Sequence, residues 1–128
     1  MKQEIQNKEI QKIYGFNGDN YIRKEVLGKG TYGEVVRAQH EKTQESVAIK
    51  IIKMDIDREG IPATALRELT LLRNYEHSNL VRMRHMDLGE KKIMIALDYI
   101  KYDLKKYWDE KFKNVKPDLK TIKNIMYQ

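Results

Sequence analysis

The chain has 128 residues, of which 41% are hydrophobic and 34% are charged, and its net charge is +6. This length allows one domain with one modest core, and the composition is typical of a globular chain rather than a disordered one. No single run concentrates the basic charge, so a nucleic-acid partner does not follow from it. The chain has no cysteine, which excludes disulfides and thiolate metal sites and favours an intracellular location in the cytoplasm, the nucleus or both.

The N-terminal region shows no targeting or membrane signal. No apolar segment of a signal peptide follows Met1. In the rest of the chain, the longest apolar run, Ile93 to Leu97, is too short to cross a bilayer. We therefore expect no membrane partner. Residues 1–19 are polar, with isoleucines poorly spaced for one helix face, and we expect a flexible, loosely ordered extension there.

The first predicted strand, Tyr21 to Leu27, leads into a glycine-rich turn with Gly28, Gly30 and Gly33. A glycine backbone turns sharply and can lie close to a bound phosphate, because no Cβ intervenes. Glycine spacing alone is weak evidence, and a flexible surface hairpin is the alternative. The residues that follow the glycines decide between these interpretations.

Glu34 to Gln39 is rich in β-branched residues and has no helical stripe, so we expect the second strand of a hairpin. A dinucleotide-binding glycine motif would instead open a helix at this point. After a polar turn, Ser46 to Lys53 is predicted as a third strand, in which Lys50 supplies a point charge suited to phosphate oxygens.

A helix is predicted from Pro62 to Arg73, with the proline in its first turn. One face carries three apolar residues and a glutamate, at Ala65, Glu68, Leu69 and Leu72. A carboxylate on an apolar face needs a cation opposite it, since an unpaired buried charge is costly. We expect Glu68 to pair with Lys50; a solvated glutamate is the alternative.

The C-terminal half contains two more strands and two more helices. Arg82 to Asp87 and Lys92 to Asp98 are predicted as strands that flank a turn. Asp103 is placed as the N-cap of one helix, and Pro117 to Gln128 begins another.

Several of these segments resemble protein kinases. Leu27 to Val35 is similar to the family's G-x-G-x-x-G-x-V loop, and Val47 to Lys50 is its V-A-I-K strand. Pro62 to Glu68 resembles the P-S-T-A-I-R-E segment of cyclin-dependent kinases, with alanine for serine and leucine for isoleucine. The residues from Asp103 to Lys106 are similar to the D-L-K-K of the same kinases.

The resemblance covers Tyr21 to Gln128 and implies an α+β fold. Residues 20–98 would form a kinase small lobe with a five-stranded antiparallel sheet and one helix. Residues 99–102 would form the hinge, and residues 103–128 the incomplete start of the large lobe, with its first helices.

The resemblance also implies ATP as the cofactor. Lys50, fixed by Glu68, would be the catalytic pair at the phosphates, and Gly28, Gly30 and Gly33 would let the backbone approach them. The backbone of Asp98 and Ile100 would bind the base edge, and Asp103 would meet the ribose, unless it acts only as an N-cap. The apolar surface around the base would come from Leu27, Val35, Ala48 and the gatekeeper Leu97.

Regulation and partners follow from the same resemblance. Thr31 and Tyr32 match inhibitory phosphorylation positions, where added negative charge would oppose the nucleotide phosphates. Arg67 would reach toward a phosphothreonine on an activation loop, and the helix Pro62 to Arg73 would be the surface that binds a cyclin. The alternatives are ordinary turn residues and a solvent-facing arginine.

Phosphoryl transfer further needs a carboxylate that accepts the hydroxyl proton, an asparagine, and an aspartate that holds Mg²⁺. These do not occur here in the required order. We expect a serine/threonine kinase sequence cut short, with no metal site of its own, weak nucleotide binding and no transfer to a protein substrate. A non-catalytic cyclin-binding module is the alternative; a nucleic-acid binder is supported only by the net charge.

Overall fold

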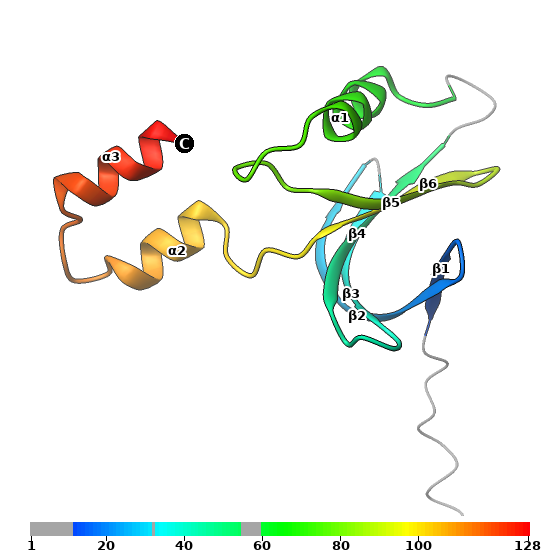
Figure 1. Cartoon of the computed structure of the whole chain (residues 1–128), viewed down its shortest axis with the longest axis horizontal. Helices are drawn as coiled ribbons and strands as arrows, with labels where there is room; N and C mark the ends of the chain where they lie inside the picture. Colours follow the sequence, from blue (N-terminus) through cyan, green and yellow to red (C-terminus); the bar gives the residue numbers. More distant parts are fainter. Residues whose placement is uncertain (1–11, 32, 55–59) are drawn as a thin grey trace, which may run out of the picture.

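The structure, a computed structural model, describes residues 12–31, 33–54 and 60–128. One antiparallel sheet carries α1 on one face, and α2 and α3 lie beyond the end of β6, away from the sheet (Figure 1). The elements are β1 (Ile13–Phe16), β2 (Asp19–Gly30), β3 (Gly33–His40), β4 (Ser46–Lys53), α1 (Ala63–Asn74), β5 (Met83–Leu88), β6 (Lys92–Asp98), α2 (Leu104–Lys111) and α3 (Leu119–Tyr127).

The six strands of the sheet have the order β1-β2-β3-β4-β6-β5, and every neighbouring pair is antiparallel. Val35 on β3 lies opposite Lys50 on β4, and Ala48 on β4 lies opposite Leu97 on β6. Side chains that lie directly opposite share a face of the sheet. These four residues, at alternate positions of their strands, therefore lie on the outer face, the face that also carries α1.

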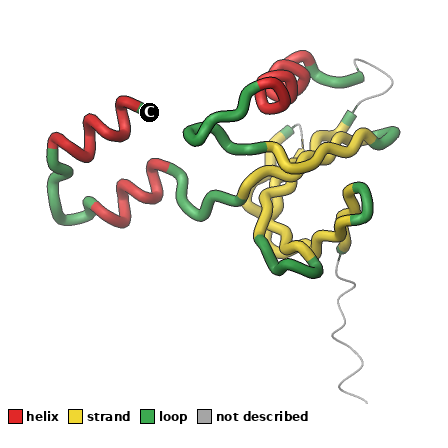
Figure 2. Tube along the Cα trace, in the orientation of Figure 1, coloured by secondary structure: helices red, strands yellow, loops and turns green. Residues whose placement is uncertain are grey.

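The other face is the inner one, because the sheet curls around it (Figure 2). Phe16 on β1 stacks on His85 of β5, with ring centroids 5.8 Å apart. Since β1 and β5 are the two ends of the strand order, this contact draws the edges of the sheet together. The core inside the curl consists of Tyr14, Phe16, Tyr21, Val36, Ala38, Val47, Ile49, Ile51, Met94 and Ala96.

Strand β1 is a correction to the prediction of a loosely ordered extension through residue 19 and of a five-stranded sheet. Residues 13–16 pair with β2, and the part of the predicted extension at residues 1–11 lies outside the described residues. Asn17 and Gly18 have φ of 47° and 93°, as in a two-residue hairpin turn. Tyr14 and Phe16 are each 2% exposed, and burial of these rings holds the strand.

The other predicted elements are present, and β4 and β6 have the predicted bounds. Strand β2 is longer than predicted, because Gly28 and Gly30 continue the pairing with β3. The aspartates that precede α2 and α3 cap them: Asp103 Oδ1 accepts from the Lys106 amide at 2.7 Å, and Asp118 Oδ1 accepts from the Thr121 amide at 3.0 Å. Among the described helices, none is long and apolar enough to cross a membrane.

Candidate nucleotide site

An ion pair joins the sheet to the helix on the outer face. Lys50 Nζ donates to both carboxylate oxygens of Glu68, at 2.8 Å to Oε1 and 2.7 Å to Oε2. The lysine side chain is 16% exposed and the glutamate side chain is 48% exposed. The predicted pairing is therefore present, with the amine largely covered and the carboxylate open to solvent on one side.

The position of Glu68 follows from how α1 packs. Ala65 and Leu69 are buried against Ile52, Ile93 and Ile95 of the sheet. Residues three and four apart lie on one helix face, so this contact also turns Glu68 toward the sheet. Lys50 precedes Ile52 by two residues and therefore shares its face of β4. The apolar contact thus brings the carboxylate to the amine.

The glycines of the hairpin have different surroundings. Gly33 has a φ of +145°, and a Cβ there would clash with the carbonyl oxygen of Ile51. This glycine is required by the close approach of β3 to β4, a packing reason independent of any ligand. Gly28 has a negative or extended φ, and, apart from its chain neighbours, no heavy atom of the described residues lies within 4 Å of the place where a Cβ would stand. The space beside Gly28 therefore fits the predicted approach of a phosphate.

Two cavities open near these groups. One of about 260 Å³ lies between β4 and α1 and is lined by Lys50, Ile52, Pro62, Thr64, Ala65 and Glu68. The other, of about 280 Å³, lies beside the glycine hairpin and is lined by Lys29, Gly30, Thr31, Gly33, Glu34 and Lys53. Lysine amines border both cavities, which suits an anionic ligand.

Three of the residues predicted to surround the base, Val35, Ala48 and Leu97, share the outer face with Lys50. Leu27 is 44% exposed, whereas Val35, Ala48 and Leu97 are half-buried. Val35, Ala48 and Leu97 form the apolar part of the outer face next to Lys50, with Val35 directly opposite the lysine. Ile100, which is 61% exposed, lies after the end of β6 and before α2. The contacts of its backbone and that of Asp98 with a base stay predictions.

Other predicted residues lie apart from this surface. The carboxylate of Asp103 caps α2, which confirms the N-cap, while its contact with a ribose stays a prediction. Thr31 is exposed in the hairpin turn and Arg67 is exposed on α1. Tyr32 lies outside the described residues. The regulatory roles of these residues stay predictions.

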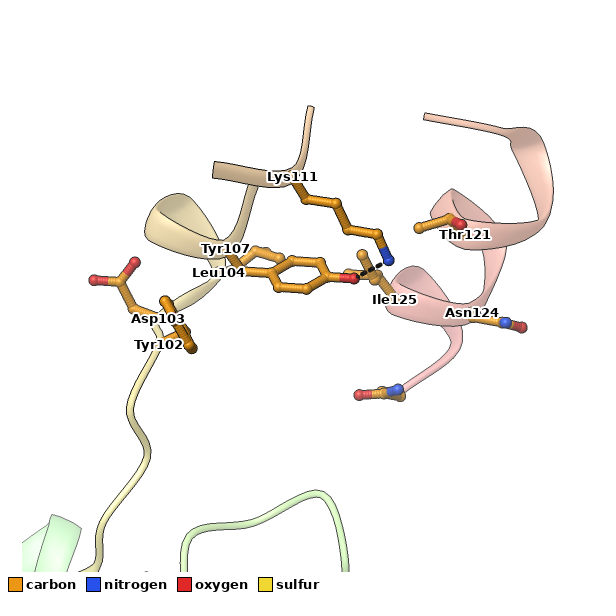
Figure 3. Close-up of a pocket in the computed structure, with 9 residues that line it drawn as sticks. Tyr102, Asp103, Leu104, Tyr107, Lys111, Thr121, Asn124 and Ile125 are labelled. Atoms are coloured by element: carbon orange, nitrogen blue, oxygen red, sulfur yellow. Dashed lines mark hydrogen bonds between the residues drawn. The ribbon is translucent and has the colours of Figure 1, made fainter. Parts of the chain in front are cut away.

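A third cavity, of about 580 Å³, lies between α2 and α3 (Figure 3). Lys111 Nζ donates to Tyr107 Oη at 2.6 Å on its α2 side, whereas the carboxylate of Asp103 points away from α3. Asp103 is the one predicted site residue in its lining, which also includes Tyr102, Leu104, Thr121, Asn124, Ile125 and Gln128. This cavity is therefore not the candidate nucleotide site. No group of three or more histidine, cysteine or acidic side chains is placed to hold a metal ion within the described part of the chain.

The sequence motifs do not include the arginines that hold the predicted hinge. Arg84 Nε donates to Asp98 Oδ1 at 2.6 Å, and its Nη1 donates to Glu45 Oε2 at 3.0 Å. These hydrogen bonds, that to Asp98 above all, raise the pKa of the Arg84 guanidinium above its ordinary value. Arg37 Cζ lies 5.8 Å from the ring centroid of Tyr99. Neither contact follows a local spacing rule, so only the folded chain shows it.

A strand lysine paired with a helix carboxylate, next to a glycine hairpin, is the arrangement with which kinases hold nucleotide phosphates. The model of the protein kinase domain family matches residues 21–128 of the chain. The chain belongs to this family, whose members in general bind ATP and Mg²⁺ and transfer a phosphoryl group. The kinase resemblance of the glycine hairpin and the Val47 to Lys50 strand is thereby confirmed at the level of the family.

Proposed function

We propose that the chain is the ATP-binding part of a cyclin-dependent-type serine/threonine protein kinase. The observation that carries this proposal is the contact of Lys50 Nζ with both carboxylate oxygens of Glu68. In kinases this ion pair must be in place before the lysine can hold the nucleotide phosphates. Here the pair is formed, because the apolar contact of α1 with the sheet places the glutamate.

Each group on the outer face has a distinct task in this proposal. Lys50 binds phosphate oxygens, and the open space beside Gly28 lets the backbone approach them. The apolar surface that contains Val35 and Ala48 stacks on the base, and the backbone of residues 98–100 binds its edge. Bound Mg²⁺ would neutralise charge on the phosphates.

The cyclin-dependent type rests on the segments Pro62 to Glu68 and Asp103 to Lys106. On α1, Leu66 and Leu71 are exposed by 53% and 58%, and exposed apolar residues suit a partner protein such as a cyclin. Since the ion pair to Lys50 is already formed, a cyclin bound to α1 would stabilise it rather than create it. Such a partner agrees with a cytoplasmic or nuclear location.

We further propose that these 128 residues alone bind nucleotide and transfer nothing. The groups that a kinase uses to accept the substrate proton and to hold Mg²⁺ are not among them in the required order. A protein substrate would therefore be phosphorylated only by a chain that also supplies those groups.

Nucleotide titration tests the proposal. Lys50→Met should weaken ATP binding by about tenfold or more, since a charge-assisted contact to phosphate is lost. Lys42→Met removes the same charge from the exposed turn between β3 and β4 and should leave the Kd unchanged. Equal affinity of wild type and Lys50→Met for ATP would contradict the phosphate-binding role.

A second candidate is a non-catalytic module that captures a cyclin. The exposure of Leu66 and Leu71 on α1 favours it. Stoichiometric co-purification with a cyclin, without protection of Lys50 by ATP against an amine-reactive reagent, would support this module. Protection of Lys50 by ATP would support the kinase proposal instead.

A further inference from the structure

We propose that Arg84 and Arg37 are positioning residues, which clamp the peptide between Asp98 and Tyr99 from opposite faces of the sheet. The clamp sets the direction of the backbone that binds the base edge, and in this respect it rests on the proposed nucleotide function. Three observations support the clamp: the contacts of Asp98, those of Tyr99, and the contacts that support each arginine. The fixed direction of the peptide between Asp98 and Tyr99 is inferred from them.

Asp98 is held from the inner face. It is the last residue of β6 and lies opposite the buried Val47, so its side chain shares the inner face of the sheet. There its carboxylate accepts from Arg84 Nε at 2.6 Å, while Arg82 Nε lies 3.9 Å from Oδ2. The amide of Asp98 also donates to the Arg82 carbonyl oxygen at 3.0 Å. The side chain of Asp98 is therefore held by Arg84 on β5, and its backbone is held by Arg82, the residue directly before β5.

Tyr99, the next residue, is held by a strand on the other side of β4. Arg37 Cζ lies 5.8 Å from the ring centroid, a distance at which a cation is attracted to an aromatic face. Arg37 alternates with the buried Val36 and Ala38 on β3, so it belongs to the outer face. Asp98 and Tyr99 are thus held from different faces by different strands.

Both arginines are themselves braced, so neither can swing away without breaking other contacts. Arg37 Nε donates to Glu25 Oε1 at 2.6 Å, and its Nη1 donates to Ser46 Oγ at 3.2 Å. Arg84 Nη1 donates to Glu45 Oε2 at 3.0 Å. The side chains of Arg84 and Asp98 are only 25% and 31% exposed, and partial exclusion of water strengthens a charge-assisted hydrogen bond.

Fixing two consecutive side chains on opposite faces fixes the plane of the peptide that joins them. The Asp98 carbonyl oxygen is part of that peptide, so its direction is set before any ligand arrives. A preorganised acceptor lowers the ordering cost of binding. Loss of either arginine should therefore loosen this backbone and weaken binding of the base, with no change at the phosphates.

The first experiment needs no ligand. Amide hydrogen exchange is measured on the full chain for wild type, Arg84→Gln and Arg37→Gln, with Arg73→Gln as the control. Arg73 lies in the last turn of α1 and is exposed. We expect faster exchange in residues 98–101 in the first two variants, partial recovery in Arg84→Lys, and no change in the control. If Arg84→Gln unfolds, Arg37→Gln alone decides whether the clamp exists.

The second experiment separates the base from the phosphates by titration with adenosine and with ATP. Arg84→Gln and Arg37→Gln should weaken both ligands by the same factor, about three- to tenfold. Lys50→Met should weaken ATP and leave adenosine unchanged. If the wild type binds no adenosine, the proposed function fails, while the exchange experiment still decides the clamp. Unchanged exchange in folded Arg84→Gln and Arg37→Gln, or in folded Arg37→Gln where Arg84→Gln unfolds, overturns the clamp. Faster exchange with unchanged adenosine affinity overturns its role in binding.

Discussion

The guanidinium of Arg23 on β2 binds the carboxylate of Glu34 on β3 through two parallel hydrogen bonds, Nη1 to Oε1 at 3.0 Å and Nη2 to Oε2 at 3.1 Å. Arg23 Nη1 also donates to Tyr14 Oη at 2.9 Å, so this arginine joins β1, β2 and β3. Glu34 is the residue that follows Gly33, which places the contact at the base of the glycine hairpin. The hydrogen bonds from Arg23 hold the pKa of Glu34 below its ordinary value of 4.5.

This pair makes the stability of the sheet depend on acid. Because the pKa of Glu34 is lower in the folded chain than in the unfolded one, its contribution is complete above the ordinary value of 4.5 and is lost as the pH falls through the lower folded value. Glu34→Gln should reduce the free energy of unfolding at neutral pH by about 1 kcal/mol, since the pair is partly exposed. The free energy of unfolding of Glu34→Gln should also fall less than that of the wild type between neutral and acid pH. Urea unfolding across that range measures both, and equal acid dependence in Glu34→Gln and wild type would contradict the assignment.

Two glycines of the hairpin provide a matched pair of variants. Gly33→Ala should reduce the free energy of unfolding by about 2 to 4 kcal/mol, because its φ is unfavourable for alanine and the new Cβ meets the Ile51 carbonyl oxygen. Gly28→Ala should fold like the wild type, since no atom of the described residues outside its chain neighbours lies within 4 Å of the new Cβ, but should bind ATP more weakly. Thermal unfolding and ATP titration separate these effects. A Gly33→Ala variant with the wild-type Tm would show that β3 and β4 separate easily.

The packing of α1 should control the nucleotide site from a distance. Leu69 is 8% exposed and packs in the cluster of Ile52, Ile93 and Ile95, whereas Leu71 on the same helix is 58% exposed. Leu69→Ala should reduce the free energy of unfolding by about 2 to 4 kcal/mol. It should also weaken ATP binding, since Glu68 is then held less firmly against Lys50. Leu71→Ala is the control and should leave both unchanged. If folded Leu69→Ala binds ATP like the wild type, the ion pair does not depend on this contact.

Local signals predict most of the sheet and the helix, and the physical reason is that their information is short-range. The face of α1 that contains Leu69 and Glu68 follows from helical periodicity, and the pairing of Glu68 with Lys50 follows from the cost of an unpaired charge. Strand β1 had a local signal as well: the dipeptide Asn17-Gly18, directly after Phe16, is typical of the turn of a two-residue hairpin. The polar character of residues 1–19 as a whole masks this turn signal and leads to the prediction of a loosely ordered extension.

The contacts that hold Asp98 and Tyr99 depend on the folded sheet and have no local signal in the sequence. Arg84 and Asp98 are 14 residues apart, and Arg37 lies much further from Tyr99 in sequence. Only the strand order, with β6 between β4 and β5, brings these groups together. In the same way, only the folded structure shows that Gly33 lies close to the backbone of β4 while Gly28 does not, so the two glycines are needed for different reasons. A spacing motif treats the two glycines as equivalent, and their backbones do not.

Helix α3 should make the chain self-associate. Its apolar residues are unusually exposed: Leu119 by 65%, Met126 by 80% and Tyr127 by 95%. Apolar side chains gathered on one helix favour association, because contact between two molecules removes them from water. We expect light scattering to show a mass that rises with protein concentration, and Met126→Gln with Tyr127→Ser to lower that rise. Leu80→Gln exchanges an exposed leucine outside α3 for a polar residue and is the control. A monomer at all concentrations, or an equal effect of the control, would show that α3 is not the associating surface.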